Sequence, residues 1–247
     1  MDKKPEVIFL SDMDGTLTPS RLPMEEHFAR ELEKLLDHYK FYIVTGSDLA
    51  KVAEQIPPNI ISKVSGVYAS MGNEFYVSGK KLYENEFTPE GALLEKLTFY
   101  RNNTKYPYEL YPNFIEERCG MVNFCVVGRD CPLAARRQYQ EWDDASKERE
   151  GIALELSAEF PKYDFSIGGS ISIDIVPHGF GKVQAADRIR KIHPNEKIIF
   201  LGDRTEKGGN DYDLAQRLLE LGNSEIVAVR DSTDALEYLR SNGFLHD

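Results

Sequence analysis

The sequence predicts a Rossmann-like α/β fold with a mainly parallel sheet, interrupted by an α+β insert. Three observations carry this prediction. Short, unbroken apolar runs occur in both halves of the chain, as expected for strands that are buried on both faces. Helical patterns alternate with these runs, which is typical of α/β proteins. A long middle segment instead alternates polar and apolar residues, as half-exposed antiparallel strands do.

Four apolar runs are expected to form the parallel strands. They are residues 7–10, 41–44, 198–201 and 226–229. Each run is short and is followed by polar or turn-forming residues, which end a strand. In an open α/β fold the active site lies beyond the carboxyl ends of such strands, so the residues after each run are the first candidates for function.

Four helices are expected between these runs, because their apolar residues recur at helical spacing. The apolar positions are Phe28, Leu32, Leu35 and Leu36; Val52 and Ile56; Val183, Ala186 and Ile189; and Leu214, Leu218 and Leu219. Asp48 is expected to cap the second helix, which Pro57 would end. Gly222 would end the last one.

The middle segment is expected to form a domain of its own. Residues 121–127 and 170–175 alternate in polarity, and residues 133–150 read as a charged helix between them. We therefore expect residues 1–81 and 180–247 to form the α/β domain and residues 82–179 to form the α+β insert.

Composition excludes several classes of partner. The 247 residues carry a net charge of −11, so the surface should repel nucleic acids and anionic membranes. No apolar run approaches the length of a membrane-spanning helix, and the N-terminus lacks the pattern of a signal peptide. Three cysteines at six-residue intervals fit neither a zinc site nor a disulfide framework. A cytoplasmic location is expected.

Acidic residues follow two of the predicted strands. Asp12 and Asp14 come after the first strand, and Asp203 follows the strand at residues 198–201. If these carboxylates gather at one edge of the sheet, their repulsion is relieved by a divalent cation, for which oxygen ligands favour Mg²⁺. Lys182 opens a helix and can hold both a carboxylate and phosphoryl oxygens. The pattern predicts magnesium-dependent phosphoryl transfer.

Arginines are concentrated in the insert, although the chain is acidic overall. Guanidinium groups bind phosphate in a bidentate manner, so a converging set would form a second phosphate site. Ser172 and Asp174 alternate onto one strand face, where they can bind sugar hydroxyl groups. The arginines are Arg118, Arg129, Arg136 and Arg137.

These motifs resemble the haloacid dehalogenase superfamily. Its first motif is Asp-x-Asp-Gly-Thr, here residues 12–16, and its second is represented by Thr45 or Ser47, which would bind substrate. The third is Lys182, and the fourth matches residues 202–203 and 209–211. The resemblance implies that Asp12 is the nucleophile, that Asp14 is the general acid and base, and that the insert is a type II cap domain. It also implies Mg²⁺ bound by Asp12, the Asp14 carbonyl and Asp203.

The insert further resembles that of eukaryotic-type phosphomannomutases. The similar stretches are residues 114–123, 128–131, 136 and 165–174, together with 12–21 and 202–211 outside the insert. This resemblance implies a hexose phosphate substrate and a homodimer that forms through the cap. The residues that would contact the substrate are Arg21, Arg118, Arg129, Arg136, Ser172 and Asp174.

Three functions are compatible with the sequence. The first is a mutase that interconverts mannose 6-phosphate and mannose 1-phosphate through a bisphosphate, with a hexose 1,6-bisphosphate as activator. The second is a sugar phosphatase of the same superfamily, in which water accepts the phosphoryl group; Thr45 is more typical of those relatives. The third is a module that binds sugar phosphates without catalysis, which the presence of Asp12, Asp14, Lys182 and Asp203 disfavours. The insert resemblance favours the mutase.

Overall fold

A seven-stranded sheet is the centre of the first of two compact units in the computed structural model, which describes residues 6–245. This core unit contains the chain up to Glu84 and again from Lys182 onward, and the insert contains residues 85–181. The expectation that no signal peptide is present concerns residues 1–5, which lie outside the described part of the chain.

The core sheet is mainly parallel, and its strand order is β11-β10-β1-β2-β3-β4-β5. The parallel strands are β1 (Val7–Asp12), β2 (Lys40–Val44), β3 (Gly66–Ala69), β10 (Lys197–Gly202) and β11 (Ser224–Ala228). All four predicted apolar runs lie in or overlap these strands, and together with the separate antiparallel sheet of the insert they confirm the predicted fold class. β11 is only half-buried because it lies at the edge of the sheet.

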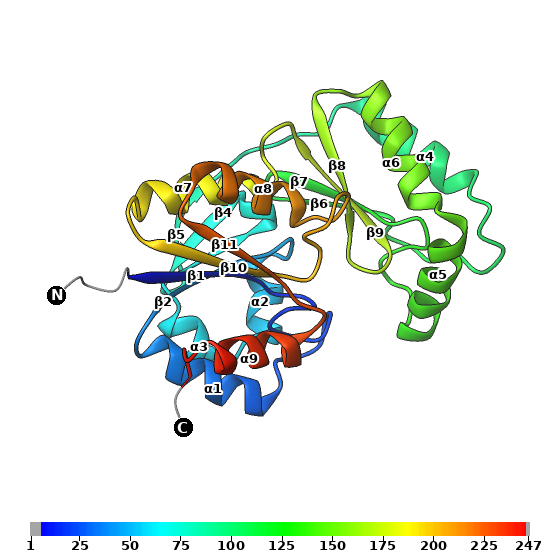
Figure 1. The fold of residues 1–247 in the computed structure, drawn as a ribbon. Helices are drawn as coiled ribbons and strands as arrows, with labels where there is room; N and C mark the ends of the chain where they lie inside the picture. The colour runs from blue at the N-terminus through cyan, green and yellow to red at the C-terminus, as the bar shows by residue number, and fades with distance from the viewer. Residues whose placement is uncertain (1–5, 246–247) are drawn as a thin grey trace. The chain divides into compact units, whose positions relative to one another are not determined.

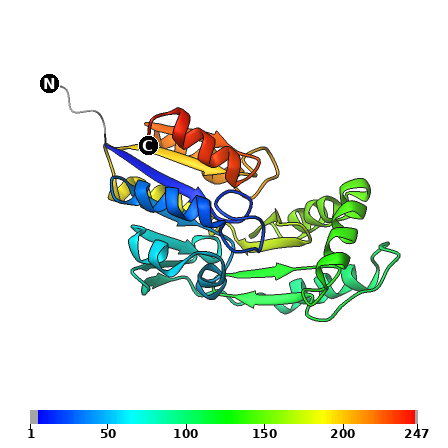
Figure 2. The same ribbon diagram turned by 90° about the horizontal axis from the view of Figure 1, so that it is seen from below.

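Helices cover both faces of the core sheet (Figure 1). Those that bury apolar residues on one face are α1 (Glu26–Leu36), α2 (Leu49–Gln55), α3 (Pro58–Lys63) and α9 (Ser232–Ser241). Those on the other face are α7 (Val183–Ile192) and α8 (Tyr212–Leu221). Figure 2 shows α1 (blue) and α9 (red) side by side on one face of the sheet. Within the described residues, no helix has both the length and the apolar character needed to cross a membrane.

The predicted helices form, with local differences. Asp48 caps α2 by accepting a hydrogen bond from the Lys51 N–H at 2.8 Å. Pro58 begins α3 directly after α2 has ended. Leu219, expected on the apolar face of α8, is half exposed, and Ala215 is buried in that helix instead.

An antiparallel hairpin extends the core sheet beyond its parallel part. β4 (Glu74–Val77) pairs with β3, and β5 (Lys80–Glu84) pairs with β4 at the edge. The sequence pattern did not predict these strands, because β5 is mostly exposed and carries three charged residues among five.

The insert is a four-stranded antiparallel sheet whose strand order is β6-β7-β9-β8. Its strands are β6 (Ile115–Arg118), β7 (Met121–Phe124), β8 (Tyr163–Gly168) and β9 (Ser172–Pro177). Its helices are α4 (Gly91–Asn102), α5 (Leu133–Ser146) and α6 (Glu148–Glu159). Val122, Phe124, Ile173 and Ile175 share a core with apolar residues of these helices. The opposite face of the sheet is polar, as predicted.

Two predicted elements of the insert differ from the structure. The helix expected over residues 133–150 breaks at Lys147, which has a left-handed backbone (φ 58°) between α5 and α6. The strand expected over residues 121–127 ends at Phe124, because the chain then turns: the Gly128 N–H donates to Cys125 O at 3.0 Å. Residues 125–127 are buried in the core of the insert, which accounts for their apolar side chains, but they do not form a strand.

Candidate active site

The loop after β1 carries the first two predicted acids. Asp12 ends the strand and is buried. The Met13 carbonyl accepts a hydrogen bond from the Thr18 N–H at 3.0 Å, which folds the following residues into a tight turn. Gly15 has φ +90° in that turn, and a Cβ there would lie 2.5 Å from Asp203 Oδ2. The Asp-x-Asp-Gly sequence therefore needs glycine so that the turn can approach Asp203.

Lys182 lies next to Asp12, just before α7. Its Nζ donates to Asp12 Oδ1 at 2.6 Å and to Asp211 Oδ1 at 2.7 Å, and the lysine side chain is 1% exposed. Burial alone would lower the pKa of Lys182, but the Asp12 and Asp211 carboxylates outweigh that effect and raise the pKa above its ordinary value. Lys182 is therefore a fixed positive charge beside Asp12.

Three carboxylates gather around this lysine. Asp12, Asp203 and Asp211 each offer an oxygen, and these oxygens all lie within 4.8 Å of one another. Burial raises the pKa of Asp203 to about 6, and repulsion from Asp211 adds to the rise. Burial also raises the pKa of Asp12; Lys182 opposes this, and the other two carboxylates reinforce it. The three carboxylates thus carry more negative charge than the single Lys182 ammonium can balance.

This donor set fits a divalent cation. All the candidate ligand atoms are carboxylate oxygens, which hard cations prefer. Lys182 supplies one positive charge against three neighbouring carboxylates, so a bound cation would relieve the remaining repulsion. The structure adds Asp211 to the acids considered from the sequence, although one of its oxygens already accepts a hydrogen bond from Lys182.

Asp14 is held by groups from two other segments. The Arg21 backbone N–H donates to Asp14 Oδ1 at 2.7 Å, and the Ser47 hydroxyl donates to Asp14 Oδ2 at 3.4 Å. The Thr45 hydroxyl accepts from the Ser47 N–H at 3.0 Å. Thr45 therefore stabilises the loop after β2, whereas the Ser47 side chain contacts Asp14.

A turn of left-handed residues supports this loop. Ser70, Met71 and Gly72 have φ values of 50°, 60° and 81°. Ser70 N–H donates to Ser47 O at 2.9 Å, and Met71 N–H donates to Thr45 O at 2.9 Å. Left-handed non-glycine residues cost about 1–3 kcal/mol each and persist where the surroundings fix them, often at functional sites. The turn fixes the backbone of the Thr45 loop.

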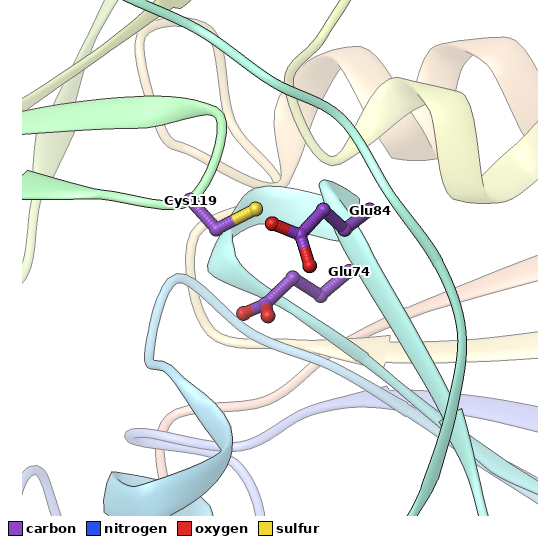
Figure 3. Close-up of side chains that lie close together, drawn as sticks. All are labelled: Glu74, Glu84 and Cys119. Atoms are coloured by element: carbon purple, nitrogen blue, oxygen red, sulfur yellow. The ribbon is translucent and has the colours of Figure 1, made fainter.

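A second pair of acids in the core unit has a structural explanation. Glu74 and Glu84 are opposite each other on β4 and β5, and Figure 3 shows their side chains close together. Lys81 forms ion pairs with both, at 2.9 Å from Glu74 Oε1. Burial would raise the pKa of Glu74, but hydrogen bonds from Tyr76, Lys81 and Ser70 outweigh it and lower that pKa. Lys81 thus offsets one of the two negative charges, and hydrogen bonds from Tyr76 and Ser70 stabilise the Glu74 carboxylate.

The insert has a polar row across its sheet. Glu116, Asn123, Asp174 and Ser166 are paired in register from β6 through β7 and β9 to β8. Asn123 Nδ2 donates to Asp174 Oδ1 at 2.5 Å. Ser172 lies two residues before Asp174 and so faces the same side of the sheet. The predicted sugar-binding residues therefore belong to one polar surface.

Two of the predicted arginines converge on this row. Arg118 Nη2 and Arg129 Nε both contact Glu116 Oε2, at 2.5 and 3.0 Å. Arg129 Nη1 also donates to Asn123 Oδ1 at 2.7 Å and to Ser172 Oγ at 3.1 Å. The two side chains are only 9% and 11% exposed. Paired guanidinium groups fixed around one anionic oxygen have the geometry that recognises phosphate.

Arg136 lies on α5, close to the same region. Burial raises the pKa of the Cys125 thiol to about 11, and the positive charges of Arg129 and Arg136 oppose that rise. Burial lowers the pKa of Arg136. Its buried Nη1 has no hydrogen-bond partner among residues 6–245. A buried donor of this kind is suited to a ligand.

The predicted site residues fall into two groups, one in each unit. The core unit contains Asp12, Asp14, Arg21, Thr45, Ser47, Lys182 and Asp203, and the insert contains Arg118, Arg129, Arg136, Ser172 and Asp174. Arg21 contacts Asp14 through its backbone N–H. The sequence-based site did not include Asp211 or Glu116. The signal for Asp211 was its place in residues 209–211, which match the fourth motif, although an acid before a helix is also an ordinary helix cap.

Known proteins resemble this chain over most of its length. A model of the eukaryotic phosphomannomutase family matches residues 28–239. The phosphomannomutase of Saccharomyces cerevisiae is 34% identical over 230 residues, which cover 90% of this chain and 90% of the yeast protein. Phosphomannomutase 1 of Homo sapiens is 33% identical over 240 residues, which cover 93% of this chain and 90% of the human protein.

Solved structures show the same fold at lower sequence identity. A sugar phosphatase of subclass IIB in the haloacid dehalogenase superfamily aligns with a TM-score of 0.60 at 14% identity, covering 97% of this chain and 100% of that one. The family match spans the acids of the core unit after β2 and the polar surface of the insert. The chain therefore belongs to the eukaryotic phosphomannomutase family.

Proposed function

We propose that the protein is a phosphomannomutase, which interconverts mannose 6-phosphate and mannose 1-phosphate through an aspartyl phosphate and a hexose bisphosphate. Its sequence is 34% and 33% identical to two phosphomannomutases over most of the chain, which supports a hexose phosphate as the substrate. The chemistry rests on one observation: the buried ammonium of Lys182 lies 2.6 Å from Asp12 Oδ1. A carboxylate beside a fixed positive charge can attack a phosphoryl group whose charge that lysine also stabilises.

In this proposal Asp12 and Asp14 divide the work. An Asp12 carboxylate oxygen forms a bond to phosphorus while the bond from phosphorus to the sugar oxygen breaks. Asp14 donates a proton to that departing oxygen and, in the reverse transfer, takes the proton from the accepting hydroxyl group. Hydrogen bonds from Arg21 N–H and Ser47 Oγ hold Asp14 for this role.

The core unit would be the catalytic domain, with Mg²⁺ as its cofactor. Asp12, the Asp14 carbonyl and Asp203 would hold the cation, which supplies charge neutralisation for the phosphoryl oxygens. A hexose 1,6-bisphosphate would act as activator because it can phosphorylate Asp12 and so restore the phosphoenzyme.

The insert would be the domain that selects the substrate. Arg118, Arg129 and Arg136 would bind the phosphate that is not reacting, and Ser172 and Asp174 would bind sugar hydroxyl groups. The shared contact of Arg118 and Arg129 with Glu116 supports a phosphate site there. Such a site would accept either end of a hexose bisphosphate, as a mutase requires.

The protein would act as a cytoplasmic homodimer formed through the insert. Large exposed apolar side chains on two insert helices support this assignment: Leu133 is 58% exposed and Leu154 is 74% exposed. Light scattering coupled to size-exclusion chromatography distinguishes a dimer from the 28.2 kDa monomer.

One assay tests the proposed reaction. The protein is incubated with Mg²⁺ and mannose 1-phosphate, with and without a hexose 1,6-bisphosphate, and both mannose 6-phosphate and free phosphate are measured. Isomer that forms faster with the bisphosphate is expected. Phosphate release without isomer would instead assign a sugar phosphatase, and the absence of both products would indicate a binding module.

Two variants link this assay to the two units. Asp12→Asn should abolish product formation, because an amide is not a competent nucleophile. Arg129→Ala should raise KM for the sugar phosphate by about tenfold or more, the loss expected for one charge-assisted contact. Arg137→Ala is the matched control, since Arg137 is an exposed arginine on the same helix as Arg136. Equal effects of the two arginine variants would contradict the role of Arg129.

A further inference from the structure

A buried ion pair joins the two long helices of the insert. Asp143 on α5 and Arg149 on α6 have side chains that are 6% and 4% exposed, and Arg149 Nε lies 2.7 Å from Asp143 Oδ2. The Arg149 backbone N–H also donates to Asp143 Oδ1 at 2.9 Å. The Asp143 carboxylate thus accepts hydrogen bonds both from the side chain of Arg149 and from its backbone N–H, which has no partner within α6 because it lies in the first turn of that helix.

The remaining donors of Arg149 reach the β8–β9 turn. Its Nη1 donates to the carbonyls of Gly169 and Ser172, both at 3.2 Å. Gly168 and Ser172 are the last paired residues of that hairpin, so these two carbonyls lie at opposite ends of the turn. A planar guanidinium that bonds both ends fixes the shape of the turn.

Ser172 connects this turn to the arginine surface. Its hydroxyl accepts from Arg129 Nη1 at 3.1 Å, and the same Nη1 donates to Asn123 Oδ1 at 2.7 Å. Ser172 therefore links Asp143 and Arg149 to the polar surface that would bind the substrate in the proposed function: its carbonyl bonds Arg149, and its hydroxyl bonds Arg129. Neither residue belongs to that surface, because both are buried between α5, α6 and the turn.

Stability alone does not account for this pair. Replacing a buried ion pair by apolar residues of similar volume is often neutral or stabilising, since both ions lose their hydration on burial. Arg149 also places a positive charge in the first turn of α6, where the helix dipole is unfavourable to cations. An arginine here donates hydrogen bonds to the carbonyls of Gly169 and Ser172, which an apolar side chain cannot do.

We propose that Asp143 and Arg149 are positioning residues, which hold the β8–β9 turn so that Ser172 orients Arg129 to bind the non-reacting phosphate. This inference rests on the proposed function. The inferred effect of the pair is on sugar-phosphate affinity and not on the bond-breaking step, because the pair belongs to the insert whereas Asp12 and Asp14 belong to the core unit.

The test is the double variant Asp143→Leu/Arg149→Met, which fills the site with apolar side chains and leaves neither charge unpaired. Isothermal titration with mannose 1-phosphate in the presence of Mg²⁺ measures affinity, and thermal melting measures folding. We expect Kd to rise about tenfold. The melting temperature should fall to a similar extent as in the Arg190→Met control, because both changes remove donors to backbone carbonyls. In the assay the loss should fall on KM more than on kcat.

Two single variants complete the design. Arg149→Lys keeps the charge beside Asp143 but loses the planar fork, so its Kd should lie between those of the wild type and the double variant. Arg190→Met is the matched structural control: Arg190 of the core unit also donates to backbone carbonyls, those of His193, Glu196 and Gly222. Arg190→Met should lower the melting temperature without changing Kd.

The outcomes separate the two claims. If the wild type itself does not bind mannose 1-phosphate, the proposed function fails. If the wild type binds and the folded double variant binds equally well, the positioning role is overturned. Should the double variant not fold, Arg149→Lys decides: a Kd equal to that of the wild type contradicts the inference. A Kd raised by that variant, with no change in Kd for Arg190→Met, supports it.

Discussion

Asp203 is the residue whose ionisation should respond most directly to a bound cation. Its pKa is raised to about 6 by burial and by Asp211, and Lys182 bonds the other two acids of the cluster rather than Asp203. In the absence of a cation, the folded protein therefore holds a proton on this residue at a pH where an unfolded chain has lost it. Folding and cation binding are linked through the same carboxylate.

This linkage predicts a pH-dependent stability of the metal-free protein. Because the pKa of Asp203 is higher in the folded state than its ordinary value of 3.8, its stabilising contribution is complete below pH 3.8 and is lost as pH rises to about 6. The free energy of unfolding should fall across that range by on the order of 1–3 kcal/mol from Asp203. Urea denaturation in EDTA at pH 4 and pH 7.5 measures it.

Two comparisons isolate the effect of Asp203. Asp203→Asn should show a smaller loss of stability over the same pH range, because the amide does not titrate. Added Mg²⁺ should restore the wild type at pH 7.5 and have less effect on the variant. A metal-free wild type whose pH dependence matches that of Asp203→Asn would contradict the assigned pKa shift.

Single residues differ in how far sequence alone could place them. Asp12, Asp14 and Asp203 could be predicted because strand ends in a parallel sheet meet at one edge. Asp211 lies in the stretch that matches the fourth motif, but its contact with Lys182 at 2.7 Å could not be predicted, because it joins two segments that are far apart in the chain. Glu116 was likewise missed: its importance comes from two arginines that reach it, one of them from a different loop.

At the scale of elements, periodicity predicted strands and helices with a regular apolar pattern. It missed the elements and breaks that depend on tertiary contacts. The strands β1, β2, β10 and β11 and the helices α1, α2, α7 and α8 followed from apolar spacing, whereas the buried strand β3 and the helices α3 and α9 were not predicted. The hairpin of β4 and β5 did not, because an exposed edge strand has no apolar pattern. The break between α5 and α6 is also absent from local sequence, since a left-handed Lys147 is stabilised by the distant partners of Asp143 and Arg149.

The loop before Arg129 offers a prediction at this scale. Gly128 has φ +93°, and a Cβ there would lie 2.0 Å from Tyr111 O and 2.7 Å from Pro112 O, both backbone atoms. Gly128→Ala should therefore reduce the free energy of unfolding by about 2–4 kcal/mol. Denaturant titration followed by circular dichroism measures the change.

Gly151→Ala is the matched control for that substitution. Gly151 lies inside α6, and a Cβ there meets nothing within 4 Å. Alanine is favoured over glycine in a helix by about 0.5–1 kcal/mol, so this variant should be slightly more stable than the wild type. The same sign for both substitutions would show that the Gly128 loop can rearrange.

At the scale of the whole molecule, the chain has separate apolar cores in its two units. Leu35 belongs to a core cluster of the first unit and Leu156 to that of the insert, and both are fully buried. Domains with their own cores can unfold separately, so a single two-state transition is not expected.

Paired substitutions should reveal this independence. Leu35→Ala and Leu156→Ala each remove the same atoms from a filled core, at a cost of about 2–5 kcal/mol. In differential scanning calorimetry, each should lower the temperature of a different transition. If both substitutions shift one common transition by similar amounts, the two units unfold as a single cooperative body.

The core unit is discontinuous in sequence, and this has a consequence for its biosynthesis. β1 needs β10 as a neighbour, yet the whole insert is translated between them. At about 5–20 residues per second, the ribosome releases β10 many seconds after β1, while the contiguous insert is already complete. A nascent chain consequently presents Asp12 without its lysine and without the opposing acids. Translation itself delays the enzyme's reactivity until the polypeptide is nearly finished.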